Sequence, residues 1–403
     1  MKVLLVNQAF YPDVVATAQL LSDFALKLVE RGHQVTVVAS SRGYDDTTIA
    51  YPTLETWRGV RILRIWNPGL GKKAKWRRWV NFGVFWLNAT RILLFLPKHE
   101  VTVCLTSPPL ISTLGTLMVK LKSGAVVPWI MDLNPDEAVA AGWLKKGGLT
   151  ERILTLIQNW SFQQASRIIA LDRFMAERLR AKGVHPQVIH TDAPWSHDQA
   201  VKYDPAARDA FRSEHGLHGK FVVMYSGNHS PCHPLDTILA VALELRAESG
   251  VHFFFVGGGT EFKTGRDFQS EHGVNNVTTL PYQPMEKLSG SLSSADLHLV
   301  VMGEPYVGMV HPCQIYNILN LGLPFLFIGP EESHGGDLSR RLADPSYASL
   351  KQHGDTRGII ALIREAAARG PLPPNPASQK LGAEFSHSVL CPRLVRVIED
   401  AAT

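Results

Sequence analysis

The first 39 residues read MKVLLVNQAFYPDVVATAQLLSDFALKLVERGHQVTVVA. A short apolar run, Val3 to Val6, is typical of a fully buried strand. Apolar residues then recur at helical spacing over residues 20–29, and Gly32 provides a stop before the next apolar run, residues 34–39. A strand, a helix and a second strand in this order predict a parallel sheet with a crossover helix.

The same alternation continues along the chain and is interrupted once. The remaining strand candidates of the first half are apolar runs at residues 60–65, 101–105, 125–131 and 167–170. From residue 191 to 219 the chain is polar, rich in His, Asp and Pro, and lacks a sustained period. A second set of strand candidates follows, at residues 220–225, 251–256, 276–280, 296–301 and 324–328.

This pattern predicts an α/β protein with two doubly wound, Rossmann-like parallel sheets. We expect the first domain over residues 1–195 and the second over residues 196–382. An amphipathic segment at residues 385–398 predicts a last helix, within about 383–403, that packs back on the first domain.

The composition supports a globular enzyme or binding protein. The chain has 403 residues, with 41 Lys plus Arg against 36 Asp plus Glu, and 45% of its residues are hydrophobic. These values exclude a disordered or collagen-like chain. Four widely spaced cysteines without a CxxC pair argue against a disulfide framework and favour a reducing, cytoplasmic setting. The apolar run after Met1 is also too short for a secretory signal.

Ligands of open α/β sheets bind where strands turn into helices. The first such turn, residues 7–17, is long and partly polar, and it opens a helix whose free N–H groups can hold an anion. It lacks the GxGxxG pattern of a dinucleotide-binding site, which argues against a hydride-transfer enzyme. An ordinary connecting loop is the alternative.

Three turns of the second half carry stronger signals. Gly227 follows one strand candidate, and residues 257–259, three glycines, follow the next; both allow close approach of a phosphate to the backbone. In residues 308–324, Pro312 predicts a helix start and Gly322 its end. A helix N-terminus with a polar side chain further along suits a diphosphate beside a ribose. Tight turns without a ligand remain the alternative.

Taken in order, these segments resemble the GT-B fold glycosyltransferases, more narrowly the retaining, family-four type that builds bacterial surface polysaccharides. The resemblance rests on motifs spread over nearly the whole chain: Tyr11-Pro12, Thr17-Ala18, residues 31–37 (RGHQVTV), residues 132–136 (DLNPD), residues 225–228 (YSGN), residues 256–259 (VGGG) and residues 311–324.

The resemblance implies roles for individual residues. Asp132 and Glu304 are the expected catalytic residues, and Asp13 and Thr17 are expected at the acceptor side of the cleft. The expected donor-binding residues are Gly227, Asn228, Gly257, Gly258, Gly259, Glu261, Lys263, His311, Pro312, Cys313, Gln314 and Asn317. Asp132 could instead cap a helix, and Glu304 could be a surface residue.

The chain also departs from the family pattern. Val14 and Val15 replace a Gly pair, and Met131 stands where many relatives have His. Gln314 replaces a frequent Lys, and Asn317 replaces the second Glu of the E-x7-E signature. Fewer cations around the diphosphate weaken stabilisation of the leaving group.

Histidines and cysteines near the donor turns permit a rival interpretation. His229, Cys232, His233, His311 and Cys313 are zinc ligand types. The His-x-x-Cys-His spacing is uncommon for zinc, and the resemblance implies no metal requirement. We therefore expect no cofactor besides the donor substrate, a UDP- or GDP-sugar.

A basic and aromatic segment suggests attachment to anionic membrane. Its residues are Lys72, Lys73, Lys75, Trp76, Arg77, Arg78, Trp79, Phe82 and Trp86. Cations for headgroups and indoles for the boundary layer are typical of an interfacial helix. Polar residues such as Asn81 and Asn88 argue against a spanning helix. Aromatic core contacts beside a solvated basic face are the alternative, and no nucleic-acid-binding motif accompanies the patch.

The sequence thus predicts transfer of a hexose or N-acetylhexosamine from a nucleotide sugar to a lipid-linked or glycan acceptor. We expect a cytoplasmic protein, peripheral on the inner face of the cell membrane. A sugar-nucleotide epimerase of the same shape and a non-catalytic nucleotide-sugar-binding protein are the alternatives.

Overall fold

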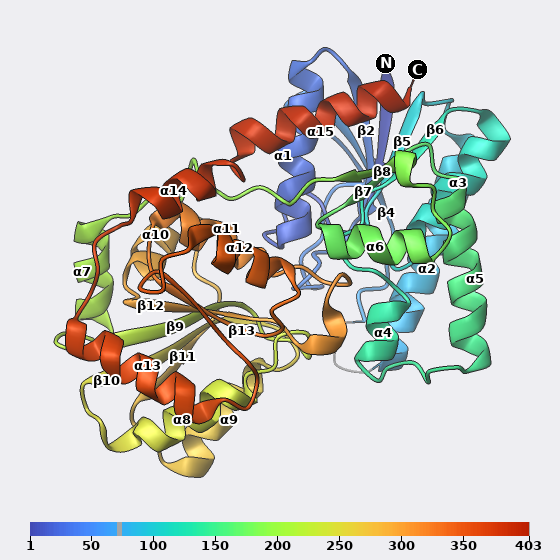
Figure 1. Cartoon of the computed structure of the whole chain (residues 1–403). Coiled ribbons are helices and arrows are strands. Elements are labelled where there is room, and N and C mark those ends of the chain that lie inside the picture. The colour runs from blue at the N-terminus through green and yellow to red at the C-terminus, as the bar shows by residue number, and fades with distance from the viewer. Residues whose placement is uncertain (71–74, 403) are drawn as a thin grey trace. The chain divides into compact units, whose positions relative to one another are not determined.

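The computed structural model describes residues 1–70 and 75–402 (Figure 1). The chain divides into two compact units. Unit 1 comprises Met1–Pro194, Gly308–Val310 and Leu390–Thr403, and unit 2 comprises Trp195–Val307 and His311–Val389. Each unit contains its own parallel sheet.

The sheet of unit 1 has the order β3-β4-β2-β1-β5-β6, and only its edge strand β3 is antiparallel. The strands are β1 (Lys2–Val6), β2 (Gln34–Ser40), β3 (Leu54–Trp57), β4 (Val60–Ile65), β5 (Val101–Cys104) and β6 (Ala125–Pro128). Two short strands, β7 (Ile168–Ala170) and β8 (Ile189–Thr191), pair with each other. A bridge between Trp129 and Ile169 connects them to the end of β6.

Helices cover both faces of this sheet (Figure 1). They are α1 (Ala16–Glu30), α2 (Lys75–Phe95), α3 (Ile111–Lys122), α4 (Asp136–Ala140), α5 (Leu149–Gln163) and α6 (Arg173–Ala181). In Figure 1, α1 lies on one side of the sheet and α2, α3 and α5 lie on the other. Buried Phe85, Ala89 and Leu93 of α2 pack against the apolar side chains of β1, β2 and β5, because one face of α2 is apolar at helical spacing.

The last helix, α15 (His387–Ala401), is held on unit 1 by ion pairs of its C-terminal part. Glu399 contacts the Arg31 guanidinium at 3.0 Å and the His33 imidazole at 2.9 Å. Arg393 binds the buried carboxylate of Asp192. The buried apolar side of α15, which includes Leu394 and Ile398, adds to these contacts.

The sheet of unit 2 is parallel throughout, with the order β11-β10-β9-β12-β13-β14. The strands are β9 (Phe221–Asn228), β10 (Val251–Gly258), β11 (Val277–Leu280), β12 (Leu297–Val301), β13 (Phe325–Ile328) and β14 (Ala348–Lys351). The helices are α7 (Pro205–Glu214), α8 (Asp236–Glu244), α9 (Phe262–His272), α10 (Met285–Ser293), α11 (Gln314–Leu321), α12 (His334–Leu342), α13 (Thr356–Arg369) and α14 (Pro376–Ala383).

Continuous apolar runs form the central strands of unit 2 because both sheet faces are covered. Along β10, Phe253 and Phe255 belong to one buried cluster, whereas Phe254 and Val256 belong to the cluster on the opposite face. The predicted fold class, two doubly wound parallel sheets, is confirmed.

Some elements were not expected from the sequence. The strands β3 and β14 lie at sheet edges, where half-exposed residues such as Glu55 and Ser349 break the apolar pattern. The polar stretch at residues 191–219, which lacks a sustained period in the sequence, contains the helix α7. Its start is capped by Asp204, whose side chain accepts from the Ala207 N–H, and Pro205 occupies the first helical turn.

Candidate functional site

The glycine turns of unit 2 lie at the ends of two adjacent strands. Gly227 at the end of β9 pairs with Gly257 of β10, and Asn228 pairs with Gly258. A Cβ atom on Gly257 would lie 1.9 Å from the Gly227 carbonyl oxygen, and the φ of Gly257 is +145°. Only glycine therefore fits at residue 257, and the two strand ends approach closely enough to form one backbone surface.

Hydrogen bonds hold this glycine surface in place. The His229 N–H donates to the Gly258 carbonyl at 2.7 Å, and the Glu261 N–H donates to the His229 carbonyl at 3.0 Å. The Tyr225 hydroxyl donates to the Asn228 carbonyl at 2.7 Å. The turns after β9 and β10 are therefore tied to each other, which suits a site that must approach a ligand without rearranging.

Helix α11 brings a polar side chain to the same place. The helix ends at Gly322, which has a φ of +76°, as the sequence predicted. In its first turn, the Gln314 side-chain amide lies 3.4 Å from the position of a Cβ on Gly227. The buried Nε2 atom of Gln314 forms no hydrogen bond within 3.5 Å among the described residues, although the Gln314 side chain lies close enough to the Tyr225 hydroxyl to lower the pKa of that hydroxyl. A buried N–H group without a partner is costly unless a ligand accepts from it.

Asn317, one turn further along α11, is already engaged within unit 2. Its Oδ1 atom accepts from the backbone N–H of His197 at 3.0 Å. The Oδ1 acceptor of Asn317 is therefore used by the protein backbone. The side-chain NH₂ group is the part of Asn317 that remains for a donor sugar.

The other expected donor residues are spread around these turns. His311 and Pro312 are buried, and the His311 ring is hydrogen-bonded to the Tyr316 hydroxyl. Cys313 is the N-cap residue of α11. Glu261 and Lys263 are exposed at the start of α9. Glu304 is exposed in the short helix that follows β12.

The histidines and cysteines of the rival zinc interpretation do not form a metal-ligand cluster among the described residues. Over residues 1–70 and 75–402, no group of three His, Cys, Asp or Glu side chains is placed to hold a metal. His233 uses its Nδ1 atom on the Val301 carbonyl at 2.7 Å. Burial lowers the pKa of His229 to about 4, and the His229 ring lies against the backbone of Gly258 and Gly227.

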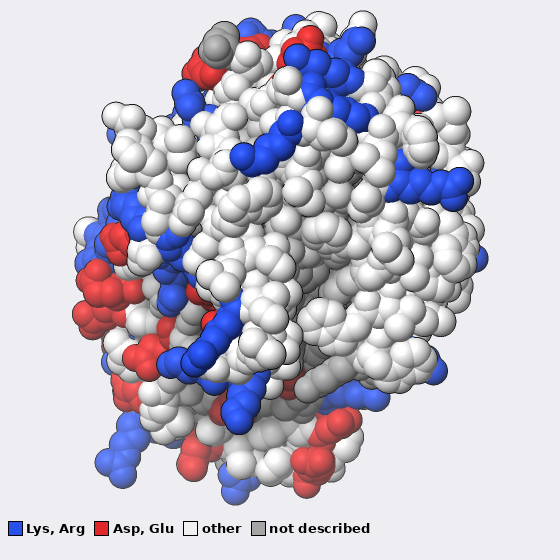
Figure 2. Space-filling view, turned by 90° about the vertical axis from the view of Figure 1, so that its right-hand side faces the viewer, with Lys and Arg blue, Asp and Glu red and all other residues white. Residues whose placement is uncertain are grey.

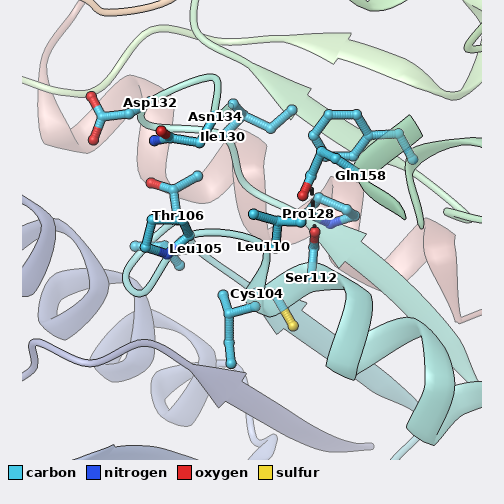
Figure 3. Close-up of a pocket in the computed structure, with 13 residues that line it drawn as sticks. Cys104, Leu105, Thr106, Leu110, Ser112, Pro128, Ile130, Asp132, Asn134 and Gln158 are labelled. Atoms are coloured by element: carbon cyan, nitrogen blue, oxygen red, sulfur yellow. Dashed lines mark hydrogen bonds between the residues drawn. The ribbon is translucent and has the colours of Figure 1, made fainter. Parts of the chain in front are cut away.

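In unit 1, Asp132 lies at a small pocket beyond the ends of β5 and β6 (Figure 3). Asp132 and Thr106 lie at one end of this pocket. At the other end, the Gln158 amide donates to the Ser112 hydroxyl at 3.2 Å. Leu110, with a φ of +61°, precedes the first turn of α3 at the pocket wall.

The environment of Asp132 favours its protonated form. Burial raises the pKa of Asp132 to about 8, and the nearby Glu137 carboxylate adds to the rise. A carboxylic acid that is largely neutral at pH 7 can donate a hydrogen bond, and its conjugate base is a stronger proton acceptor than an ordinary carboxylate. Asp132 can therefore exchange a proton with a hydroxyl group.

The turn after β1 contains the two expected acceptor residues. The Asp13 carboxylate accepts from the Tyr44 N–H and from the Tyr51 hydroxyl, both at 3.0 Å. Burial and the adjacent Asp13 charge raise the pKa of Tyr51 to about 12. Thr17 is half-buried in the first turn of α1. Asp13 thus holds the loop that follows β2.

The basic and aromatic segment coincides with the start of α2. Lys72 and Lys73 lie outside the described residues, and the side chains of Lys75 and Arg78 are not among those described. Arg77 is exposed, with its guanidinium over the Trp76 ring at 5.4 Å from the ring centre. Among the described residues, no helix has the length and hydropathy that crossing a bilayer requires.

The aromatic residues of this segment divide into two groups. Trp76 and Trp79 are 59% and 56% exposed. Phe82 and Trp86 are half-buried, and the Trp86 Nε1–H donates to the Pro109 carbonyl at 3.2 Å. Trp86 therefore packs on the interior of unit 1. This agrees with the alternative interpretation, in which aromatic residues of the segment make core contacts.

Further apolar side chains are exposed on the helical layer of unit 1. They include Leu87 and Phe95 of α2, Leu121 of α3 and Leu149 and Leu156 of α5. Figure 2 shows a broad uncharged expanse on this side of the molecule, with Lys and Arg side chains at its border. This surface has no local signal in the sequence, because its residues are far apart in the chain.

The comparisons with known proteins follow this geometry. The model of the glycosyl transferase 4-like domain matches residues 16–195. This half of the chain therefore resembles that family in sequence. This domain contains Thr17 and Asp132, and it includes α2 with its exposed indoles.

Relatives of the whole chain are distant in sequence. "Probable glycosyltransferase WbjE" from Pseudomonas aeruginosa is 22% identical over 240 residues, and the match spans 59% of each protein. Sucrose-phosphate synthase from Thermosynechococcus elongatus has a TM-score of 0.77 at 13% identity and covers 99% of this chain and 98% of its own. Anabaena HepE in complex with UDP and glucose has a TM-score of 0.72 at 13% identity, with 99% of both chains covered.

The structural similarities confirm the fold that the sequence indicated. The chain has the GT-B fold, and its residues 16–195 resemble a glycosyl transferase 4-like domain in sequence.

Proposed function

We propose that this protein transfers a hexose or N-acetylhexosamine from a nucleotide sugar to a lipid-linked or glycan acceptor, with retention of configuration. The observation that carries the proposal is the surface formed by Gly227 and Gly257 beside the buried amide of Gln314. The solved structure of HepE, a protein of the same fold, contains UDP. The proposal of a UDP- or GDP-sugar donor rests on this surface and on the UDP in the HepE structure.

In this proposal, unit 2 binds the donor. The glycine turns at residues 227–228 and 257–259 leave room for the diphosphate, and the first turn of α11 supplies backbone N–H groups and the Gln314 amide. These groups stabilise the negative charge that develops on the diphosphate as the bond to the sugar breaks.

In unit 1, Asp132 is proposed to contact the acceptor hydroxyl or the transferred sugar. The acceptor hydroxyl attacks the sugar from the face that the diphosphate leaves, so the configuration is retained without a protein nucleophile. The departing diphosphate takes the proton of this hydroxyl. The raised pKa of Asp132 lets its carboxyl group act as a hydrogen-bond donor near neutral pH. Glu304 is the second candidate, on the grounds of the family resemblance alone.

We also propose that residues 72–86 attach the protein to the inner face of the cell membrane, in a role of surface polysaccharide synthesis. The exposed indoles of Trp76 and Trp79 support this proposal. Each cation near an anionic surface contributes about 1 kcal/mol, so several are needed for stable binding.

The test is incubation of the purified protein with a panel of UDP- and GDP-sugars, with and without a membrane lipid extract. Release of nucleotide that depends on the extract supports the transferase. Conversion of the sugar nucleotide without any acceptor would identify an epimerase instead. Tight nucleotide binding without turnover under either condition would identify a binding protein.

A further inference from the structure

A second pocket of unit 1 contains an arginine without a partner. The pocket lies beyond the ends of β1, β2 and β4 and is closed on one side by α2, with an empty volume of about 500 Å³ including its open mouth. Gln8, Arg42, Asn67 and Asn81 supply its polar lining. Ligands of parallel sheets bind at this end of the strands.

Arg42 provides an uncompensated positive charge. Its side chain is half-buried, and its guanidinium has no hydrogen bond or ion pair with any described residue. No carboxylate is among the residues that line the pocket. The neighbouring acidic side chains are engaged elsewhere: Asp13 with the Tyr44 N–H and Tyr51, and Asp46 with Thr48.

A second arginine of the same sheet, Arg64, has the contacts that are typical of a structural guanidinium. The buried Arg64 pairs with Glu55 at 2.5 Å and donates to the Tyr11 carbonyl at 2.8 Å. Arg42 has neither kind of contact, although it is partly shielded from solvent. A planar guanidinium in such a position is suited to a bidentate contact with phosphate.

Two asparagines that line the pocket are hydrogen-bonded to its backbone. The Oδ1 atom of Asn67 accepts from the Gly69 N–H at 3.2 Å, and the Oδ1 atom of Asn81 accepts from the Leu70 N–H at 3.3 Å. The side-chain oxygens that would repel an anion are thereby occupied by the backbone.

Exposed indoles lie next to these two asparagines in the chain. Trp66, which precedes Asn67, is 60% exposed, and Trp79, two residues before Asn81, is 56% exposed. Indole rings favour the boundary between headgroups and acyl chains. Neither indole lines the pocket itself, so these side chains would meet a lipid outside the pocket and not the phosphate within it.

We propose that this pocket binds the phosphate of a lipid-linked acceptor, with Arg42 as the anion-binding residue and Trp66 and Trp79 contacting the lipid. The proposal rests on the proposed transferase function and narrows its acceptor to a phosphorylated lipid. The same anion chemistry could accept the phosphate of a soluble molecule, so the experiment separates the two sources.

The test measures binding to the full chain by calorimetry, with geranyl diphosphate, inorganic diphosphate and geraniol as probes. We expect geranyl diphosphate to bind more tightly than either of the others. Arg42→Gln should weaken its binding at least tenfold, and Arg42→Lys should weaken it less. Arg61→Gln, which removes an exposed cation of β4, is the matched control and should bind as the wild type does.

Equal affinity of Arg42→Gln and wild type for geranyl diphosphate would overturn the proposal. Equal affinity of inorganic and geranyl diphosphate would overturn its lipid part, as would unchanged geranyl diphosphate binding by the double variant Trp66→Ala/Trp79→Ala. Thermal unfolding of each variant checks that it folds. Because this assay needs no turnover, failure of the sugar-transfer assay alone counts against the proposed function and not against the pocket.

Discussion

The side-chain amide of Gln314 lies 3.4 Å from the position that a Cβ atom would take on Gly227. A helix and a strand end that are 87 residues apart in the chain therefore share one small surface. The absence of a side chain at residue 227 makes this approach possible. The first predictions concern this surface.

Replacing Gly257 by Ala should damage unit 2. The new Cβ would lie 1.9 Å from the Gly227 carbonyl oxygen, and the φ of +145° disfavours any other residue type. We expect the free energy of unfolding to fall by about 1–3 kcal/mol, together with loss of UDP binding. Gly250→Ala, which meets no atom within 4 Å, is the control for thermal unfolding and should stay close to wild type.

Gln314→Ala should weaken donor binding. The variant removes a hydrogen bond to a charged phosphate, which is worth about 1.5–3 kcal/mol and corresponds to a loss of at least tenfold in UDP affinity. Gln314→Glu should bind still more weakly, because it places a like charge beside the diphosphate. Calorimetry with UDP is the measurement, and exposed Gln352→Ala is the control. Wild-type affinity in Gln314→Ala would remove Gln314 from the donor site.

Asn317 allows its structural and binding roles to be separated. Asn317→Leu leaves the His197 N–H without its acceptor and should lower the free energy of unfolding by about 1 kcal/mol. Asn317→Glu can still accept from His197 and should keep or improve UDP affinity. If the Leu variant binds UDP as tightly as wild type, Asn317 has only the structural role and does not contact the ribose.

The raised pKa of Asp132 predicts a pH-dependent stability. The folded state holds the Asp132 proton up to about pH 8, whereas an unfolded aspartate loses it near its ordinary value of 3.8. Asp132 therefore makes folding less favourable as pH rises from about 4 to 8. Relative to wild type, Asp132→Asn should gain at least about 1 kcal/mol of unfolding free energy over this range, measured by urea titration at both pH values. A stability difference that does not change with pH would show that the Asp132 pKa is ordinary.

Membrane attachment should depend on the cations at the start of α2. Replacing Lys72, Lys73, Lys75, Arg77 and Arg78 by Gln should release the protein from anionic vesicles in a sedimentation assay. Wild-type binding should also weaken with added salt, because exposed charges are screened over about 10 Å at 0.1 M. Vesicles of neutral lipid are the control. Binding that is insensitive to salt would argue against an electrostatic attachment.

The sequence predicted an element correctly where the preference of its residues matches their place in the fold. Buried parallel strands such as β1 and β10 are unbroken apolar runs, and Gly322 ends α11 because it supplies the required positive φ. The site was harder to predict, because hydrogen bonds between distant residues determine it. The Asn317 contact with His197 is an example.

The Arg42 pocket had no signal in the sequence at all. Its residues come from three strand ends and one helix, and none belongs to a motif. The exposed and buried sides of α2 were predicted only in part. Trp79 and Trp86 belong to the same basic and aromatic segment of the sequence, but Trp79 is exposed and Trp86 donates a hydrogen bond to the Pro109 carbonyl.

Glu399 and Arg393 form ion pairs with residues of the early part of unit 1, so unit 1 can be completed only after the C-terminal helix has been synthesised. Residues 390–402 belong to unit 1 but leave the ribosome after the whole of unit 2. The early part of unit 1 must therefore wait, with the surface that α15 later covers still exposed, while some 200 residues are translated.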